Sequence, residues 1–292
     1  MKKLNRILSP IAGTTFALLG LTVQPASAIT PPNNIIDFKT APDGTTLDPL
    51  KLDEPNGQQI DIDGDGTKET VSTSVGNVGD IYQQFGLTVT SSIKTIGLFD
   101  SSCPSGGCGD PKSDGFSQSD PDLETGPGAG PGGSDTEPQG NLLIIEENAG
   151  DDFPDDQGTG GSMTLDFDET QFIVKIDKLT FVDDISNGEI VFTFADQSST
   201  TQNFSGQDDN DVFDLTLQDG TGPNENYRDK QVDQIDITFG SSGGVGALAF
   251  TEYRQVPFEA ETSFGVLIAA GYGLYRYYKH KKVASIKQET EE

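Results

Sequence analysis

The strongest structural signal in this chain lies at residues 161–194, which read GSMTLDFDETQFIVKIDKLTFVDDISNGEIVFTF. Hydrophobic residues occupy every second position in three short segments of this stretch. The three alternating sets are Met163, Leu165 and Phe167; Phe172, Val174 and Ile176; and Ile190, Phe192 and Phe194. Alternation of this kind, rich in β-branched and aromatic residues, is typical of half-buried strands in an antiparallel sheet.

The pattern extends to both sides of this stretch. Ile235, Ile237 and Phe239 alternate in the same way, and short apolar runs occur at 35–38, 81–85, 87–89, 93–99 and 142–145. No segment from 29 to 253 has apolar residues at helical spacing. We therefore predict an all-β domain at 29–255, with roughly ten to twelve strands in a jelly-roll-like antiparallel β-sandwich.

One segment inside this domain has a different composition. Residues 101–140 are dominated by Gly, Pro, Ser and Asp and offer almost no apolar side chains, which predicts a long low-complexity loop. It contains the two cysteines of the chain, Cys103 and Cys108. In an exported protein, four intervening residues suit a small local disulfide.

The N-terminus has the layout of a secretory signal peptide. Lys2, Lys3 and Arg6 precede an apolar segment at 11–23, and Ala26-Ser27-Ala28 forms a small-x-small cleavage pattern. We assign residues 1–28 to this peptide, with a retained N-terminal transmembrane helix as the alternative. The apolar run is short and interrupted by Gly and Thr, which favours the cleaved peptide.

The charge of the exported region excludes several classes of protein. The chain carries a net charge of −29, and 44 of its 47 acidic residues but 10 of its 18 basic residues lie between Ile29 and Thr262. Such a field repels nucleic acid. The one histidine, His280, lies in the C-terminal tail, so no Ser-His-Asp triad or His-ligated metal centre can form in the exported region. Paired carboxylates of the glycosidase type remain chemically feasible.

The clearest metal-binding pattern is DIDGDGTKE at residues 61–69. Asp61, Asp63 and Asp65 alternate with Gly64 and Gly66, as in the first half of a calcium loop. Glu69 is a further candidate ligand. Position 72, where an EF-hand would place its bidentate Glu, is a serine, and the flanks do not predict helices. An isolated Ca²⁺ site and an Asp-Gly turn between strands both remain open.

Two further acidic pairs are candidate Ca²⁺ ligands. Asp183 and Asp184 follow a predicted strand that ends at Val182, where the rim of a sandwich would display them. Asp37 and Glu252 lie on the first and last predicted strands, which hold a structural Ca²⁺ between them in many sandwich modules of the galactose-binding type. Asp and Asn also form turns, so a structural role is the alternative at each position.

A carbohydrate-binding module would be expected to show exposed aromatic platforms. The exported region has no Trp and three tyrosines, Tyr82, Tyr227 and Tyr253, while most of its Phe residues fall on predicted core positions. Sugar binding is therefore an alternative function.

The last segment, residues 256–292, has three parts. A short motif of Pro257, Phe258 and Glu259 comes first, and the mainly apolar stretch 263–278 follows. The third part is a basic cluster of Arg276, Lys279, Lys281 and Lys282. We predict a short, marginal transmembrane helix at 263–278, because its 16 residues fall below the roughly 20 that span a bilayer. The basic cluster would remain on the cytoplasmic side.

This three-part layout resembles the PEP-CTERM class of sorting signals, in the cyanobacterial form whose motif reads Pro-Phe-Glu. The resemblance implies that Pro257, Phe258 and Glu259 are recognised by an exosortase, a membrane enzyme that cleaves near the motif. The tail departs from the pattern by continuing ten residues beyond Lys282. The expected protein is thus exported, anchored in the membrane at least transiently, and then placed at the cell surface or in extracellular matrix, where exopolysaccharide is a candidate partner.

The expected function follows from these features. We predict a non-catalytic exported protein, with Ca²⁺ as its one candidate cofactor. A Ca²⁺-dependent carbohydrate-binding module is the first alternative, and an enzyme using paired carboxylates is a more distant one.

Overall fold

A computed structural model describes residues 31–102, 123, 125–126, 138–148, 154–169, 172–182, 188–204, 212–217 and 227–255. Several predicted features lie outside these residues: the signal peptide (1–28), Cys103, Cys108, Asp183, Asp184, the motif Pro257, Phe258 and Glu259, the segment 263–278, and the basic cluster. Among the described residues, no helix has the length and apolar character needed to cross a membrane.

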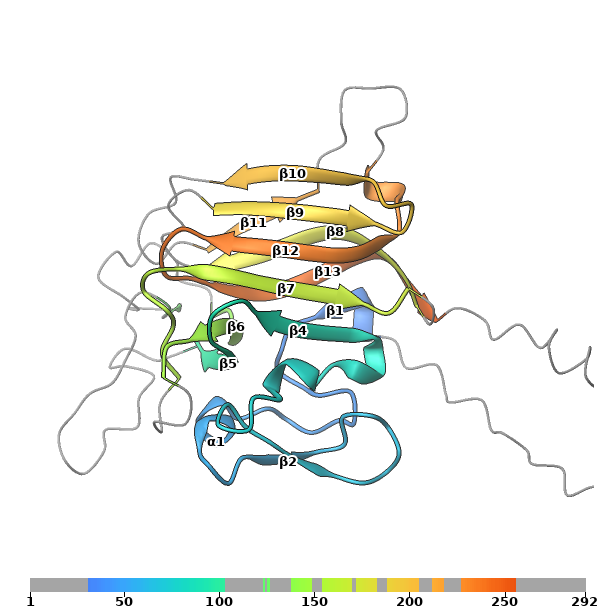
Figure 1. Cartoon of the computed structure of the whole chain (residues 1–292). Helices are drawn as coiled ribbons and strands as arrows, with labels where there is room; N and C mark the ends of the chain where they lie inside the picture. Colours follow the sequence, from blue (N-terminus) through green and yellow to red (C-terminus); the bar gives the residue numbers. More distant parts are fainter. Residues whose placement is uncertain are drawn as a thin grey trace, which may run out of the picture.

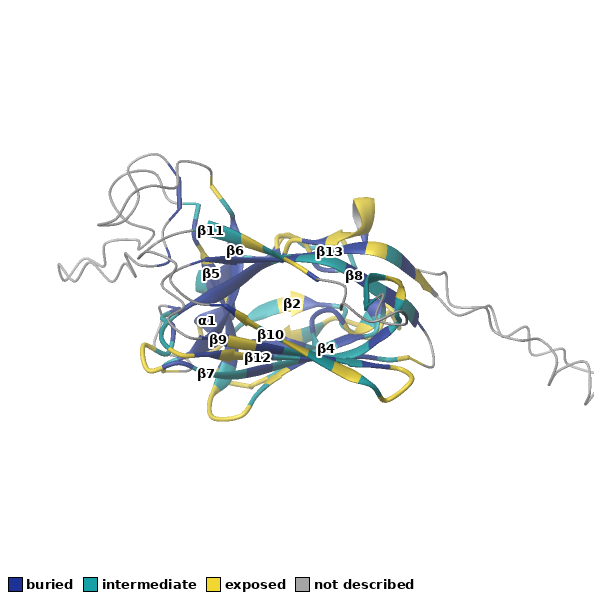
Figure 2. Cartoon of the chain, turned by 90° about the horizontal axis from the view of Figure 1, so that it is seen from above, coloured by how far each residue is buried: buried dark blue, intermediate teal, exposed yellow. Residues whose placement is uncertain are grey.

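Two antiparallel sheets pack face to face (Figures 1 and 2). The first has the order β11-β8-β13-β6-β5, and β1 also pairs with β13. Its strands are β1 (Ile35–Ile36), β5 (Thr95–Asp100), β6 (Asn141–Glu146), β8 (Phe172–Val182), β11 (Val212–Thr216) and β13 (Gly244–Gln255). The second has the order β10-β9-β12-β7-β4. Its strands are β4 (Leu87–Ser91), β7 (Gly161–Phe167), β9 (Gly188–Phe194), β10 (Ser199–Phe204) and β12 (Val232–Phe239). The predicted all-β sandwich is confirmed.

The core lies between the two sheets, as Figure 2 shows. The alternating residues predicted to point inward do so: Met163, Leu165 and Phe167 of β7 are at most 1% exposed. Aromatic rings fill much of the space. The Phe181 ring, for example, lies 5.4 Å from that of Phe204 between centroids, in a stacked arrangement. Burial of alternate side chains thus explains the period-two pattern of these strands.

Strand β6 is buried on both faces. Leu143 and Ile145 belong to the main core, whereas Leu142 and Ile144 belong to a second hydrophobic cluster on the outer side of the first sheet. Leu123, fully buried, also belongs to this second cluster. Leu123 is thus one apolar residue of segment 101–140 that is buried, and it packs with the outer residues of β6.

Hydrogen bonds join three described residues of segment 101–140, namely Ser101, Thr125 and Gly140. The Ser101 amide donates to the Gly140 carbonyl (2.9 Å), and the Thr125 amide donates to the Ser101 carbonyl (2.7 Å). The Ser101 hydroxyl also donates to the Gly140 carbonyl (2.7 Å). Ser101 and Thr125 are both fully buried. The start, middle and end of the predicted loop therefore meet at one point.

The N-terminal segment, residues 32–85, covers one side of the sandwich. It contains the 3₁₀ helix η1 (Pro32–Asn34), helix α1 (Pro49–Asp53) and a hairpin of β2 (Gln58–Ile60) and β3 (Glu69–Val71). Two further 3₁₀ helices follow, η2 (Val78–Asp80) and η3 (Gln83–Phe85); a last one, η4 (Tyr227–Asp229), precedes β12. Helix α1 contacts β5, and η2 contacts both β4 and β5. These two strands end their respective sheets, so the segment protects edges that could otherwise pair with another chain (Figure 1).

The structure corrects three local predictions. The predicted strand 35–38 ends at Ile36, because Phe38 adopts a positive φ of 56° and is fully buried. Residues 81–85 form 3₁₀ turns instead of a strand, and they end at Gly86, which has a left-handed φ of 72°. Helix α1 was not expected; Asp48 caps it by accepting a hydrogen bond from the Lys51 amide (3.5 Å).

Candidate metal site

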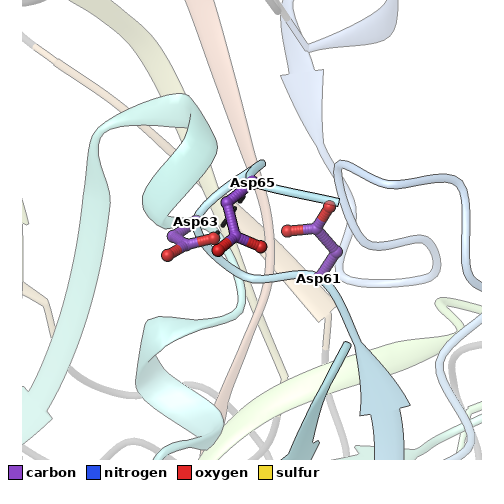
Figure 3. Close-up of side chains that lie close together, drawn as sticks. All are labelled: Asp61, Asp63 and Asp65. Atoms are coloured by element: carbon purple, nitrogen blue, oxygen red, sulfur yellow. Dashed lines mark hydrogen bonds between the residues drawn. The ribbon is translucent and has the colours of Figure 1, made fainter. Parts of the chain in front are cut away.

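The loop that joins β2 to β3 brings three carboxylates together (Figure 3). One oxygen each from Asp61, Asp63 and Asp65 lies within 4.8 Å of the other two. Asp61 is half-buried, whereas Asp63 and Asp65 are exposed. The alternation predicted from the sequence therefore gathers these three side chains at one point of the molecular surface.

Two glycines shape this loop. Gly64 and Gly66 have φ angles of 79° and 87°, a left-handed conformation that other residues rarely adopt. Their amides both donate to the Asp61 carboxylate, at 2.7 Å for Gly64 and 2.9 Å for Gly66. The Asp63 carboxylate accepts from the Asp65 amide (3.0 Å). The loop thus winds around Asp61 and turns the three carboxylates toward one another.

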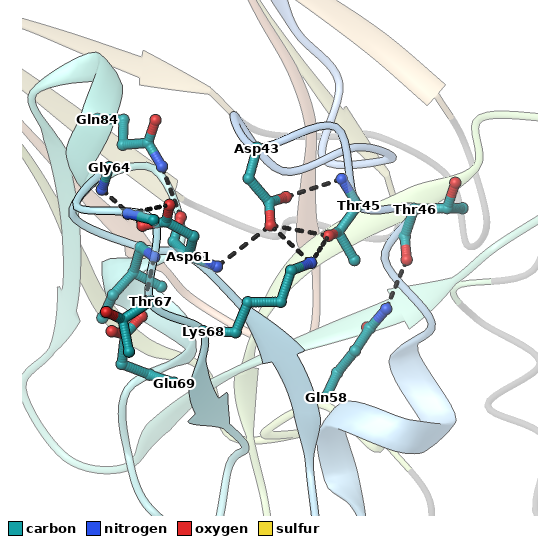
Figure 4. Close-up of polar contacts among 12 residues, drawn as sticks. Asp43, Thr45, Thr46, Gln58, Asp61, Gly64, Thr67, Lys68, Glu69 and Gln84 are labelled. Carbon is teal, nitrogen blue, oxygen red and sulfur yellow. Dashed lines mark hydrogen bonds and ion pairs between the residues drawn. The ribbon is translucent and has the colours of Figure 1, made fainter. Parts of the chain in front are cut away.

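Contacts with distant parts of the chain hold the loop (Figure 4). The Gln84 side chain of η3 donates to the Asp61 carbonyl (2.5 Å). On the other side, the Asp61 amide donates to the Asp43 carboxylate (3.2 Å). Asp43 also accepts from the Thr45 amide (2.8 Å) and lies 3.1 Å from the Lys68 ammonium. The loop is therefore tied both to the 3₁₀ region and to the turn that precedes α1.

Asp43 remains ionised to lower pH than an ordinary aspartate. Burial acts to raise its pKa, but hydrogen bonds from Thr45, Asp61 and Lys68 outweigh burial and lower the pKa. Lys68, the basic residue within the loop, thus pairs with Asp43. The three converging carboxylates of the loop retain their mutual repulsion, which is of the order of 1 kcal/mol per pair at these distances in water.

This arrangement suits a hard divalent cation. Ca²⁺ prefers carboxylate, carbonyl and water oxygens and accepts six to eight of them in flexible geometry. The loop offers three carboxylates, and its exposure leaves room for water. Glu69, the fourth predicted ligand, is placed differently: its carboxylate accepts a hydrogen bond from the Ile62 amide (3.1 Å) at the base of the hairpin.

The structure does not bring Asp37 and Glu252 together. Their segments do meet, because Ile36 pairs with Leu248 and Ile35 with Ala249. The strands run in opposite directions, so Asp37 and Glu252 follow the paired residues at opposite ends of this short ladder and diverge from it. The Glu252 carboxylate instead lies 2.7 Å from the Lys175 ammonium. Hydrogen bonds from Lys175 and Arg254 lower the Glu252 pKa.

Two buried carboxylates were not predicted as a pair. Glu146, at the end of β6, is fully buried, and Asp156 is 5% exposed and lies opposite it in an isolated bridge. The Glu146 carboxylate accepts from the Asp155 amide (3.0 Å), and the Asp156 carboxylate accepts from the Gly243 amide. In the sequence both residues stand in acidic runs that resemble turns, so no local signal distinguishes them.

Comparison of the chain with known protein families and with curated protein sequences found no match.

Proposed function

We propose that this chain is an exported, non-catalytic β-sandwich protein of the cell surface or extracellular matrix, and that its Asp61–Asp65 loop binds Ca²⁺. One observation carries the calcium proposal: three carboxylates converge within 4.8 Å on a hairpin loop that Gln84 and Asp43 hold in place. A bound cation would remove the repulsion among them.

The ion would stabilise the fold. The loop belongs to the segment that covers the β4 and β5 edges, and its anchors, Asp43 and Gln84, lie on either side of the hairpin in sequence. A Ca²⁺ ion fixed by Asp61, Asp63 and Asp65 would therefore hold the two flanks of this segment together. Extracellular fluids supply the millimolar Ca²⁺ that such an exposed site needs.

The strand order supports a jelly roll as the detailed topology. The described residues from β6 to β13 form eight strands, and the first of them (β6) pairs with the eighth (β13). Likewise the second (β7) pairs with the seventh (β12), and the third (β8) with both the sixth (β11) and the eighth. Two interleaved Greek keys produce this order, while β4 and β5 extend the two sheets at one side.

Sequence features alone support export and sorting. The leader at 1–28 directs the chain across the membrane, and the stretch 263–278 with its basic cluster holds it there. An exosortase-like enzyme would then cut near Pro257, Phe258 and Glu259. The lack of histidine between Ile29 and Thr262 supports a non-catalytic role.

Thermal unfolding tests the calcium proposal. In Ca²⁺ at 100 times the dissociation constant, the folded state gains about 2.7 kcal/mol, which corresponds to a rise of about 5–10 °C in Tm for a domain of this size. We expect this rise in the wild type and its loss in an Asp63→Asn/Asp65→Asn variant. A Glu54→Gln/Asp214→Asn variant, which removes two exposed charges away from the loop, is the matched control and should keep the rise.

Mass spectrometry of the C-terminus tests the sorting proposal separately. Material isolated from the surface of the producing cells should end close to Pro257. A chain that still ends at Glu292 would refute processing while leaving the calcium proposal intact.

A further inference from the structure

Most side chains on the outer face of the second sheet are polar, and most of these are short. Strand pairing aligns one residue from each strand in a row across the sheet. One such row consists of Thr90, Thr164, Asp236, Val191 and Thr201.

A second row lies beside it and consists of Thr88, Asp166, Gln234, Thr193 and Ser199. We call these ten residues the polar face. None of the ten is buried, and Figure 1 shows this sheet in front.

Hydrogen bonds join side chains within the polar face. The Thr164 hydroxyl donates to the Asp236 carboxylate (2.7 Å), and the Gln234 side chain donates to the same carboxylate (2.8 Å). Gln234 is the longest side chain among the ten. Five strands at the usual spacing span about 19 Å, so the surface can accommodate a broad, extended ligand. Side chains that are already held in place lose little entropy when such a ligand binds.

Its charge has one sign. Asp166 and Asp236 are the charged residues of the polar face, and Asp168 and Asp233 lie near them. Burial and then repulsion from Asp233, Asp168 and Asp236 raise the Asp166 pKa. Lys230, near the Ser199 end, is paired with Asp196 (2.9 Å).

We propose that the polar face binds a cationic polysaccharide, an amino-sugar polymer lying flat across the five strands. The carboxylates select a positively charged polymer and repel an anionic one. Six of the ten side chains carry hydroxyl groups, which can donate and accept hydrogen bonds with a hydroxyl-rich chain. Aromatic residues are lacking among the ten, so binding would rest on charge and hydrogen bonds and would not need the stacking platforms expected of a sugar-binding module.

This proposal is independent of the calcium site. The polar face lies on strands β4, β7, β9, β10 and β12, whereas the Asp61–Asp65 loop joins β2 to β3. Binding of the polymer should therefore be the same in Ca²⁺ and in a chelator. An Asp63→Asn/Asp65→Asn variant should retain it, so failure of one proposal can be told apart from failure of the other.

Binding of the full chain to chitosan-coated beads provides the test, with fully acetylated chitin beads as the neutral counterpart of the same backbone. We expect binding to chitosan and at least tenfold weaker binding to chitin. An Asp166→Asn/Asp236→Asn variant should lose about tenfold in affinity for chitosan, as removal of two favourable charge contacts implies. A variant carrying Glu54→Gln and Asp214→Asn loses the same charge elsewhere and should change less than twofold.

Thr90→Lys, which adds a positive charge at an exposed site of β4, should also weaken binding; it covers the case in which the double variant does not fold. Equal losses in the face variant and the charge-matched variant would reduce the effect to the overall acidity of the protein and overturn the proposal. Equal binding to chitin and chitosan, or no binding to chitosan, would overturn it as well.

Discussion

Replacement of Leu123 by Ala would test how the acidic segment 101–140 contributes to the fold. Leu123 lies in the predicted low-complexity loop, but in the structure it is fully buried in one cluster with Phe99, Leu142 and Ile144. Removing about three carbon atoms costs roughly 2.4 kcal/mol at ~0.8 kcal/mol each, and the cavity adds to this. We expect a loss of about 3 kcal/mol, equivalent to about 6–12 °C in Tm.

Urea unfolding and thermal unfolding of the full chain would both measure this loss. Val75→Ala, which removes an apolar side chain that is 60% exposed, is the control and should change stability by less than about 0.5 kcal/mol. If Leu123→Ala behaved like Val75→Ala, Leu123 would not cover β6. The outer cluster would then have to be stabilised in another way.

Two further substitutions probe the N-terminal segment. Gly86→Ala should destabilise by more than about 1 kcal/mol in urea, because φ is 72° and the new Cβ would lie 2.2 Å from the Phe172 ring; Gly158→Ala, in open space, should be nearly neutral. Asp43 has a lowered pKa in the folded state, so its ionised carboxylate stabilises the fold. This stabilisation is complete above the ordinary pKa of 3.8 and is lost as the pH falls through the lowered pKa. Asp43→Asn should therefore reduce stability at pH 7 and much less at pH 2, and an equal reduction at both would exclude the ionic contribution.

Strands with alternating apolar and polar residues were predictable, because one face of each such strand is buried and the other faces solvent. Met163, Leu165 and Phe167 face the core while their neighbours face solvent. The run 142–145 was recognisable as a strand, but its lack of alternation has a cause that the sequence does not show. Its second face is covered by Leu123, which lies about twenty positions earlier in the chain.

Strands at the sheet edges were harder to predict. β10 has the sequence STTQNF, and only Phe204 is buried, so it carries no hydrophobic period. Its pairing with β9 is a tertiary effect that propensity does not reveal. Strand β13 begins in a glycine-rich stretch and has register shifts against β8, which breaks the simple alternation.

The candidate metal site was predictable only where its residues are close in sequence. Asp61, Asp63 and Asp65 are local in sequence, so their spacing alone predicts that their oxygens converge. Asp43 and Gln84, which hold the loop, are 18 and 23 residues away from Asp61 and could not be found by spacing. For the Asp37–Glu252 pair the meeting of the segments was expected, but register decides whether two side chains on paired strands are close.

Calcium titration by isothermal calorimetry tests the central claim most directly. The full chain should bind Ca²⁺ at the Asp61–Asp65 loop with a saturable heat, and Asp63→Asn/Asp65→Asn should abolish that heat while the protein remains folded. No saturable heat in the wild type would contradict the claim. An unchanged heat in the variant would place the ion elsewhere and contradict it equally.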